Sequence, residues 1–149
     1  MQKETVRIKK LRPEAILPSY GSPDAVGADL YALTGAEGLT IAPGETVMVH
    51  TGLSIELPRG FAGLVYARSG LATKRGLAPA NKVGVIDPDY RGEIMISLHN
   101  HSSAPAAVQN GERVAQLVIT PCLIAEFEEA EELSETVRGV GGFGSTGRK

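Results

Sequence analysis

Glycine and proline interrupt this chain throughout, and they constrain its fold more than any other feature of the sequence. The 149 residues include 18 glycines and 9 prolines, and they contain no tryptophan. Turn-forming residues at such short intervals favour many short strands over a helical bundle. We therefore expect an all-β fold of the sandwich or jelly-roll type. We expect one domain, because a chain of this length forms a single core.

The strand-like runs between these turns are short. They are expected at residues 6–11, 46–51, 53–57, 61–67, 83–86, 93–100 and 114–120. Residues 87–92, Asp-Pro-Asp-Tyr-Arg-Gly, place Asp, Pro and Gly at typical turn positions, so they predict the tip of a hairpin. One short helix is expected, with Ser69 as its cap and Gly76 as its stop.

Charge and hydropathy argue against two classes of partner. The net charge is −2 and there is no basic run, so a general nucleic-acid or membrane-surface binder is not expected. The N-terminus lacks an apolar core of signal-peptide length, and no stretch is long enough to span a bilayer, so we expect a soluble, cytoplasmic protein.

The only cysteine, Cys122, ends an apolar run and is expected to be a small buried thiol.

The C-terminal segment 138–147, RGVGGFGSTG, is half glycine. Such a segment loses too much chain entropy to form a core element by itself. Yet it holds Arg138, Phe143, Ser145 and Thr146, and these groups can bind phosphate or stack on a base. We divide the chain into a domain, residues 1–137, and a Gly-rich C-terminal arm, residues 138–149. From its own residues this arm can either close over a nucleotide or form a frayed, solvated terminus.

Two further segments carry groups suited to phosphate. Arg68, Ser69 and Gly70 follow a strand and open the short helix, where free N–H groups and the positive end of the dipole attract anions. An ordinary helix cap with a surface arginine is the alternative. Gln116 is polar among apolar neighbours, so it either contacts phosphate or metal-bound water or faces solvent.

Two carboxylates stand out. Asp29 lies in an otherwise apolar strand, where a charge is costly unless it is paired or near a metal. Contact with the waters of Mg²⁺ and an ion pair are both open at this point. Asp87 ends a strand three residues before Tyr90, so a carboxylate that deprotonates water and a ring that packs on a sugar can face one ligand. A plain turn is the alternative.

Taken together, five segments resemble the five ordered motifs of the trimeric dUTP diphosphatases (dUTPases). They are GADLYA from Gly27, ARSGLA from Ala67, VGVIDPDYRGE from Val83, GERVAQL from Gly111 and RGVGGFGSTG from Arg138. Pro88 departs from the family, in which a small polar residue is common there, but it lies in a turn that tolerates proline. The resemblance implies a jelly-roll homotrimer whose three active sites are each shared between all three chains.

The implied reaction is dUTP + water → dUMP + pyrophosphate, with Mg²⁺ on the triphosphate, which keeps uracil out of DNA and supplies dUMP for dTMP synthesis. Water attacks the α-phosphorus, with Asp87 as its base, while Tyr90 packs under the deoxyribose and excludes a 2′-hydroxyl. The resemblance also implies that Asn81 and the main chain around Val85 recognise uracil and that Phe143 stacks on it. It implies phosphate binding by Arg68, Ser69, Gly70 and Gln116, and contact between Asp29 and magnesium-bound water. Closure over the γ-phosphate is implied for Arg138, Gly144, Ser145 and Thr146.

Two alternatives remain open from the sequence. A dCTP deaminase, or a bifunctional deaminase–diphosphatase, on the same fold would release ammonia, and Tyr90 and the Phe143 arm argue against it. A non-catalytic jelly-roll trimer would only bind nucleotide or protein. Asp87 argues against that alternative, because a binding module has no use for a base there.

Overall fold

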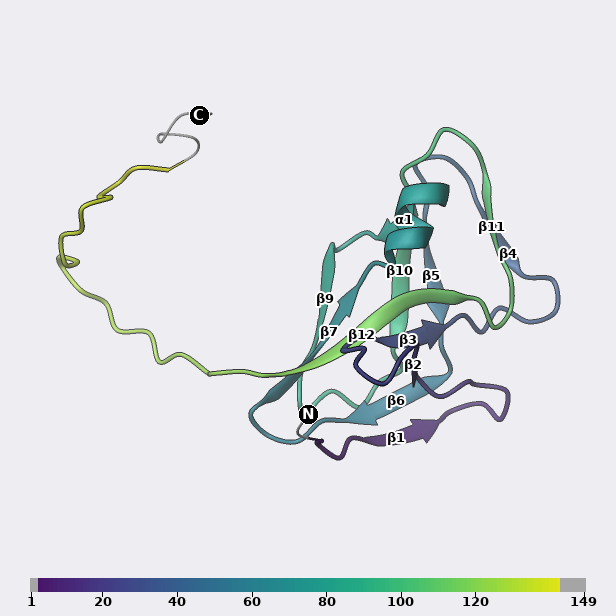
Figure 1. Ribbon diagram of the computed structural model, residues 1–149, viewed down its shortest axis with the longest axis horizontal. Helices are drawn as coiled ribbons and strands as arrows, with labels where there is room; N and C mark the ends of the chain where they lie inside the picture. Colours follow the sequence, from purple (N-terminus) through teal and green to yellow (C-terminus); the bar gives the residue numbers. More distant parts are fainter. Residues whose placement is uncertain (1–2, 143–149) are drawn as a thin grey trace.

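Residues 3–142 fold into short antiparallel strands with one short helix (Figure 1). This structure is a computed structural model, and it describes residues 3–142. The all-β fold expected from the sequence is confirmed. No helix within residues 3–142 is long and apolar enough to cross a membrane.

Two larger sheets carry most of the domain. The five-stranded sheet has the order β2 (Ser19–Tyr20), β3 (Ala28–Tyr31), β12 (Arg113–Pro121), β7 (Phe61–Tyr66) and β9 (Val83–Ile86). The three-stranded sheet has the order β5 (Thr46–His50), β10 (Met95–Asn100) and β8 (Leu77–Pro79). Two smaller ladders pair β1 (Arg7–Lys10) with β6 (Leu53–Glu56) and β11 (Ala106–Val108) with β4 (Leu39–Ile41). The helix α1 spans Ser69–Arg75.

One hydrophobic core joins the two larger sheets. Inward-facing residues alternate with exposed ones along β10, where Ile96 and Leu98 are buried and Met95 is exposed. This period of two is the pattern of a strand with one face on a core. The core cluster also takes in Leu30 of β3 and Val114 of β12, so it anchors the strands that carry the polar residues described below.

The strand register places several polar residues in one row across the five-stranded sheet. Gln116 of β12 lies opposite Asp29 of β3 on one side and opposite Tyr66 of β7 on the other. Tyr66 in turn lies opposite Val83 of β9. Residues directly opposite in an antiparallel sheet share a face, so this row leads from Asp29 to the strand that ends just before Asp87.

The structure corrects the prediction of a hairpin at residues 87–92. The strand before this turn, β9, pairs with β7, whereas β10 pairs with β5 and β8. The turn therefore crosses from one sheet to the other. Turn residues predict where a chain reverses, but strand partners depend on which apolar faces pack together, and Ile86 and Ile94 at the two ends of the turn both enter the core.

Two smaller predictions were also wrong. The cap position of α1 is Arg68, in extended conformation and without a side-chain cap bond, and Ser69 is the first helical residue. Cys122 is exposed, because it follows the last residue of β12 and only its backbone N–H is held, by Gly60 O at 2.8 Å. The predicted stop is confirmed: Gly76 has φ 66° and its N–H donates to Ala72 O.

Beyond β12 the described chain leaves the domain (Figure 1). Residues 122–142 contain no helix or strand. Their large apolar side chains are 88–112% exposed: Leu123, Ile124, Phe127, Leu133, Val137 and Val140. The domain boundary expected between residues 137 and 138 stays a prediction.

Candidate active site

A cavity of about 260 Å³ opens beside β9, and we refer to it as the β9 cavity. It is lined by four of the residues expected in the site: Asn81, Val85, Asp87 and Tyr90. Apolar side chains from both larger sheets, among them Val65 and Ile96, form much of the rest of its wall. A cavity that combines apolar walls with several polar groups suits a flat heterocyclic ring.

The strand along this cavity is the edge of its sheet. Within residues 3–142, β9 pairs only with β7, so its other edge keeps unpaired backbone groups beside the cavity. A Cβ on Gly84 would lie 3.1 Å from Asn81 Nδ2 and 3.3 Å from Val65 Cβ. Gly84 therefore leaves space for two neighbouring side chains, and one of them, Asn81, is a predicted site residue.

The loop after β9 holds Asp87 at the surface. Its turn is closed by Tyr90 N–H, which donates to Asp87 O at 3.2 Å. Arg91 Nη1 donates to Pro88 O at 2.6 Å and to Tyr90 O at 3.0 Å. These bonds use backbone carbonyls, so the exposed Asp87 carboxylate stays available to a ligand.

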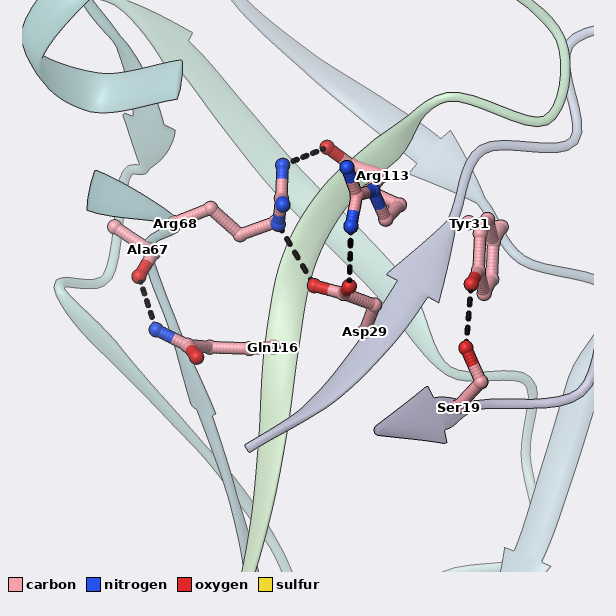
Figure 2. Close-up of polar contacts among 7 residues, drawn as sticks. All are labelled: Ser19, Asp29, Tyr31, Ala67, Arg68, Arg113 and Gln116. Carbon is pink, nitrogen blue, oxygen red and sulfur yellow. Dashed lines mark hydrogen bonds and ion pairs between the residues drawn. The ribbon is translucent and has the colours of Figure 1, made fainter. Parts of the chain in front are cut away.

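Asp29 forms an ion pair with two arginines, the group we call the Asp29 network (Figure 2). Asp29 Oδ1 accepts from Arg68 Nε at 2.7 Å, and Oδ2 accepts from Arg113 Nη1 at 3.1 Å. Arg68 Nη1 also donates to Arg113 O at 3.4 Å. The Asp29 side chain is only 12% exposed, so two guanidinium groups offset the cost of its burial. Of the two alternatives left open for Asp29, the structure shows the ion pair.

Gln116 lies beside this network on β12. Its Nε2 donates to Ala67 O at 2.9 Å, directly before Arg68 (Figure 2). A Cβ on Gly27 would lie 2.5 Å from Gln116 Oε1, so Gly27 leaves the space that the amide occupies. Arg68, Gln116 and the exposed start of α1, Ser69 and Gly70, are therefore close together along the chain and across the sheet.

Glu93, to which the sequence assigned no role, is held at the end of the Asp87 loop. Its Oε1 accepts from Gly52 N–H at 2.7 Å, and its Oε2 lies 2.9 Å from His50 Nδ1. Burial by itself raises the pKa of the Glu93 carboxyl, but the bonds with His50 and Gly52 outweigh it and hold the pKa below its usual value of 4.5. Sequence patterns gave no sign of this arrangement, because its partners His50 and Gly52 lie 43 and 41 residues earlier in the chain.

Arg138, an arm residue within the described part of the chain, lies apart from the rest of the site. Arg138 Nε donates to Gly141 O at 2.7 Å, in the exposed segment that leads away from the domain (Figure 1). Phe143, Gly144, Ser145 and Thr146 lie outside the described residues.

Comparison with known proteins identifies the family. The family model for dUTPase matches residues 13–147. The chain belongs to the dUTPase family. This confirms the resemblance drawn from the five motifs, and the match extends over the arm as well as the domain.

Curated relatives in the dUTPase family agree. The chain is 56% identical over 132 residues to a deoxyuridine 5′-triphosphate nucleotidohydrolase of Desulfitobacterium hafniense, covering 88% of this chain and 87% of that protein. It is 47% identical over 143 residues to the enzyme of the same name from Nautilia profundicola, covering 96% of this chain and 99% of that protein.

Solved dUTPase structures share the fold. The dUTPase of Staphylococcus bacteriophage 80alpha with dUpNHpp has a TM-score of 0.88 and 28% identity, covering 97% of this chain and 99% of that one. A variant dUTPase of phage phi11 of S. aureus, described with a coordinated structural Mg(II) ion, has a TM-score of 0.79 and 23% identity, covering 89% and 100% of the two chains. The jelly-roll-like fold expected from the motifs is thereby confirmed.

Proposed function

We propose that the β9 cavity and the residues around Arg68 and Gln116 carry out dUTP hydrolysis, the activity of the family to which the chain belongs. The reaction is dUTP + water → dUMP + pyrophosphate. The observation that carries the assignment of residues is the exposed carboxylate of Asp87 at the edge of a cavity that Tyr90 also lines.

In this proposal Asp87 is the general base. It orients a water molecule and accepts one of its protons while the water oxygen bonds to the α-phosphorus. The bond between the α-phosphorus and the oxygen that bridges to the β-phosphorus breaks, and pyrophosphate leaves with that oxygen. A positioned base of this kind contributes about 10²- to 10⁴-fold to the rate.

The β9 cavity would take the nucleoside. Unpaired backbone groups of β9 around Val85, together with the Asn81 amide, supply donors and acceptors for the uracil edge. Tyr90 packs under the deoxyribose and leaves no room for a 2′-hydroxyl. When the wrong base binds, a site built from hydrogen bonds is left with unpaired buried groups. Such a site therefore discriminates between bases more strongly than a site that relies on apolar fit.

Arg68, Ser69, Gly70 and Gln116 would bind the phosphates. The Asp29 network fixes the Arg68 guanidinium, and Gln116 is fixed through its bond with Ala67 O. A guanidinium held by a carboxylate is already oriented when the substrate arrives, so less entropy is lost on binding.

The described residues fit a protein-held magnesium ion poorly. No group of three or more His, Cys, Asp or Glu side chains within residues 3–142 is placed to hold a metal. Both Asp29 oxygens already accept bonds from arginine. The Mg²⁺ of the family would therefore be bound mainly by the triphosphate, where it offsets negative charge, and contact between Asp29 and its waters stays a prediction.

We propose that the active protein is a homotrimer with shared sites. The apolar side chains of residues 122–142 are exposed in the single chain, and Arg138 lies on the segment that leads away from the domain (Figure 1). A neighbouring subunit would bury these side chains and bring the arm to a site. Sedimentation should show a trimer, and a fully active monomer would refute shared sites.

The expected cytoplasmic location stays a prediction.

One assay separates the candidate activities. Incubation with dUTP should release pyrophosphate and dUMP, and incubation with dCTP should release no ammonia. Ammonia from dCTP would indicate the deaminase alternative. Nucleotide binding without either product would indicate the non-catalytic alternative.

A further inference from the structure

The Tyr90 ring lies directly over Gly92. A Cβ placed on Gly92 would meet Tyr90 Oη at 2.3 Å, Cζ at 2.5 Å and Cε2 at 2.9 Å. Real Cβ atoms essentially never come this close to another heavy atom, so no other residue at position 92 can coexist with this position of the ring. The space that Gly92 leaves is what allows the ring to fold back over its own loop.

A hydrogen bond fixes the far end of the ring. Tyr90 Oη donates to the backbone carbonyl of Glu93 at 3.0 Å. The ring is therefore held at one end by its own backbone and at the other by the residue that ends the loop. Its orientation depends on where the Glu93 carbonyl lies.

The Glu93 side chain is in turn bonded to the end of β5 and to the turn between β5 and β6. The Glu93 carboxylate accepts from Gly52 N–H at 2.7 Å and bonds with His50 Nδ1 at 2.9 Å. The Glu93 side chain is 22% exposed, so these bonds are better shielded from solvent than surface pairs are.

Further bonds hold the residues on either side. Ile94 N–H donates to Leu53 O at 2.7 Å, and Thr51 Oγ1 donates to Ile94 O at 2.6 Å. Ser54 Oγ donates to Arg91 O at 2.7 Å. The end of the loop therefore has a fixed position relative to the core.

We propose that Gly92 and Glu93 are positioning residues for the discrimination between deoxyribose and ribose, because together they determine where the Tyr90 ring lies. The inference rests on the proposed role of Tyr90 as the residue that excludes a 2′-hydroxyl. Gly92 supplies the space for the ring, and Glu93 supplies a fixed acceptor for its hydroxyl.

The geometry separates this role from a general effect on folding. The atoms that a Gly92 side chain would meet belong to the outer end of the Tyr90 side chain, which is exposed and can swing away. Gly92 is also not among the residues with positive φ, so alanine fits its backbone. Gly92→Ala should therefore fold normally while displacing the ring.

The test compares kcat/KM for dUTP and UTP in a double-mutant cycle of Gly92→Ala and Tyr90→Ala. Gly92→Ala should lower the dUTP/UTP ratio by about 10-fold or more, with a Tm close to wild type. In the Tyr90→Ala background the same change should leave the ratio unaltered, because the ring is already gone. Gly21→Ala is the matched control, since a Cβ there meets nothing within 4 Å.

Glu93 is tested in the same way. Glu93→Ala should lower the ratio in the presence of Tyr90 and leave it unchanged in the Tyr90→Ala background. Glu93→Gln should retain the ratio within about 3-fold, because its amide can accept from Gly52 N–H and donate to a neutral His50.

An unchanged ratio in Gly92→Ala, or effects of Gly92→Ala and Tyr90→Ala that simply add, would overturn the inference. These outcomes differ from failure of the proposed function. If the proposed function fails, the wild type does not hydrolyse dUTP or Tyr90→Ala itself keeps the full dUTP/UTP ratio, and the inference falls with it.

Discussion

Removing the charge of Asp29 tests whether this carboxylate serves the protein or the metal. In Asp29→Asn one amide oxygen remains to accept from Arg68 or Arg113, but the charge that offsets two guanidinium groups is lost. The Arg68 side chain is 26% exposed, so its charge-assisted bond with Asp29 contributes about 1.5–3 kcal/mol. The Arg113 side chain is 50% exposed, so its pair with Asp29 adds at most about 1 kcal/mol.

We therefore expect the free energy of unfolding of Asp29→Asn to fall by about 2 kcal/mol in the absence of nucleotide and Mg²⁺. For a chain of this size that corresponds to a decrease in Tm of about 4–8 °C. Thermal unfolding should be followed at one fixed protein concentration, since assembly makes Tm depend on concentration. Glu56→Gln is the control: its pairs with Arg7 and Arg91 are both exposed, and the expected change is below about 0.5 kcal/mol.

The same variant gives the opposite pattern if Asp29 acts through magnesium. In that case stability without ligand would match the wild type, and the Mg²⁺ concentration for half-maximal activity would rise. An unchanged Tm together with such a rise would refute the reasoning from the ion pair. A lower Tm with unchanged Mg²⁺ dependence would support it.

Four further predictions follow from the site. Asp87→Asn should lower kcat by about 10²- to 10⁴-fold while a non-hydrolysable dUTP analogue still binds; near-normal turnover would mean that Asp87 is only a turn residue. Because its pKa is lowered from 4.5, Glu93 contributes stability that is present above that pH and lost as pH falls through the lower value in the folded state. The difference in unfolding free energy between wild type and Glu93→Gln should therefore shrink as the pH falls below 4.5, and a constant difference would contradict the pairing with His50 and Gly52. Deleting residues 139–149 should leave fold and assembly nearly intact but lower kcat/KM severely, whereas normal turnover would show that the arm is dispensable. Gly70→Ala should raise helix stability by up to about 1 kcal/mol and still lower kcat/KM for dUTP; unchanged kinetics would remove Gly70 from the phosphate site.

Much of the fold could be predicted from the sequence because strand periodicity and turn chemistry are local. The expected runs at residues 46–51, 61–67 and 83–86 match β5, β7 and β9 within one residue. Gly76 ends α1 as expected, because only glycine adopts its positive φ at little cost. Strand partners could not be predicted in this way, because they depend on which apolar faces meet.

Parts of the site were predictable for a different reason. The motif resemblance predicted that Asn81, Asp87 and Tyr90 belong to one site, and the three residues line one cavity. No local sequence pattern predicts that they lie together. Ser69 was wrongly expected to cap α1. The cap position belongs to Arg68, whose guanidinium bonds with Asp29, and a contact between residues so far apart in sequence has no local signature.

Three glycines near the site have a packing role that the sequence could not show. Gly27, Gly84 and Gly92 are not among the residues with positive φ, so backbone conformation does not require glycine at these positions. Each instead leaves space for a side chain of the site, since a Cβ would lie 2.5 Å from Gln116, 3.1 Å from Asn81 and 2.3 Å from Tyr90.

At Gly70 a Cβ would meet nothing within 4 Å, so packing within the described residues does not require glycine there. Alanine is the better helix former, so helix propensity does not favour glycine at this position either. In the proposed function a phosphate group lies against the first turn of α1, where a methyl group would keep it away from the backbone N–H groups.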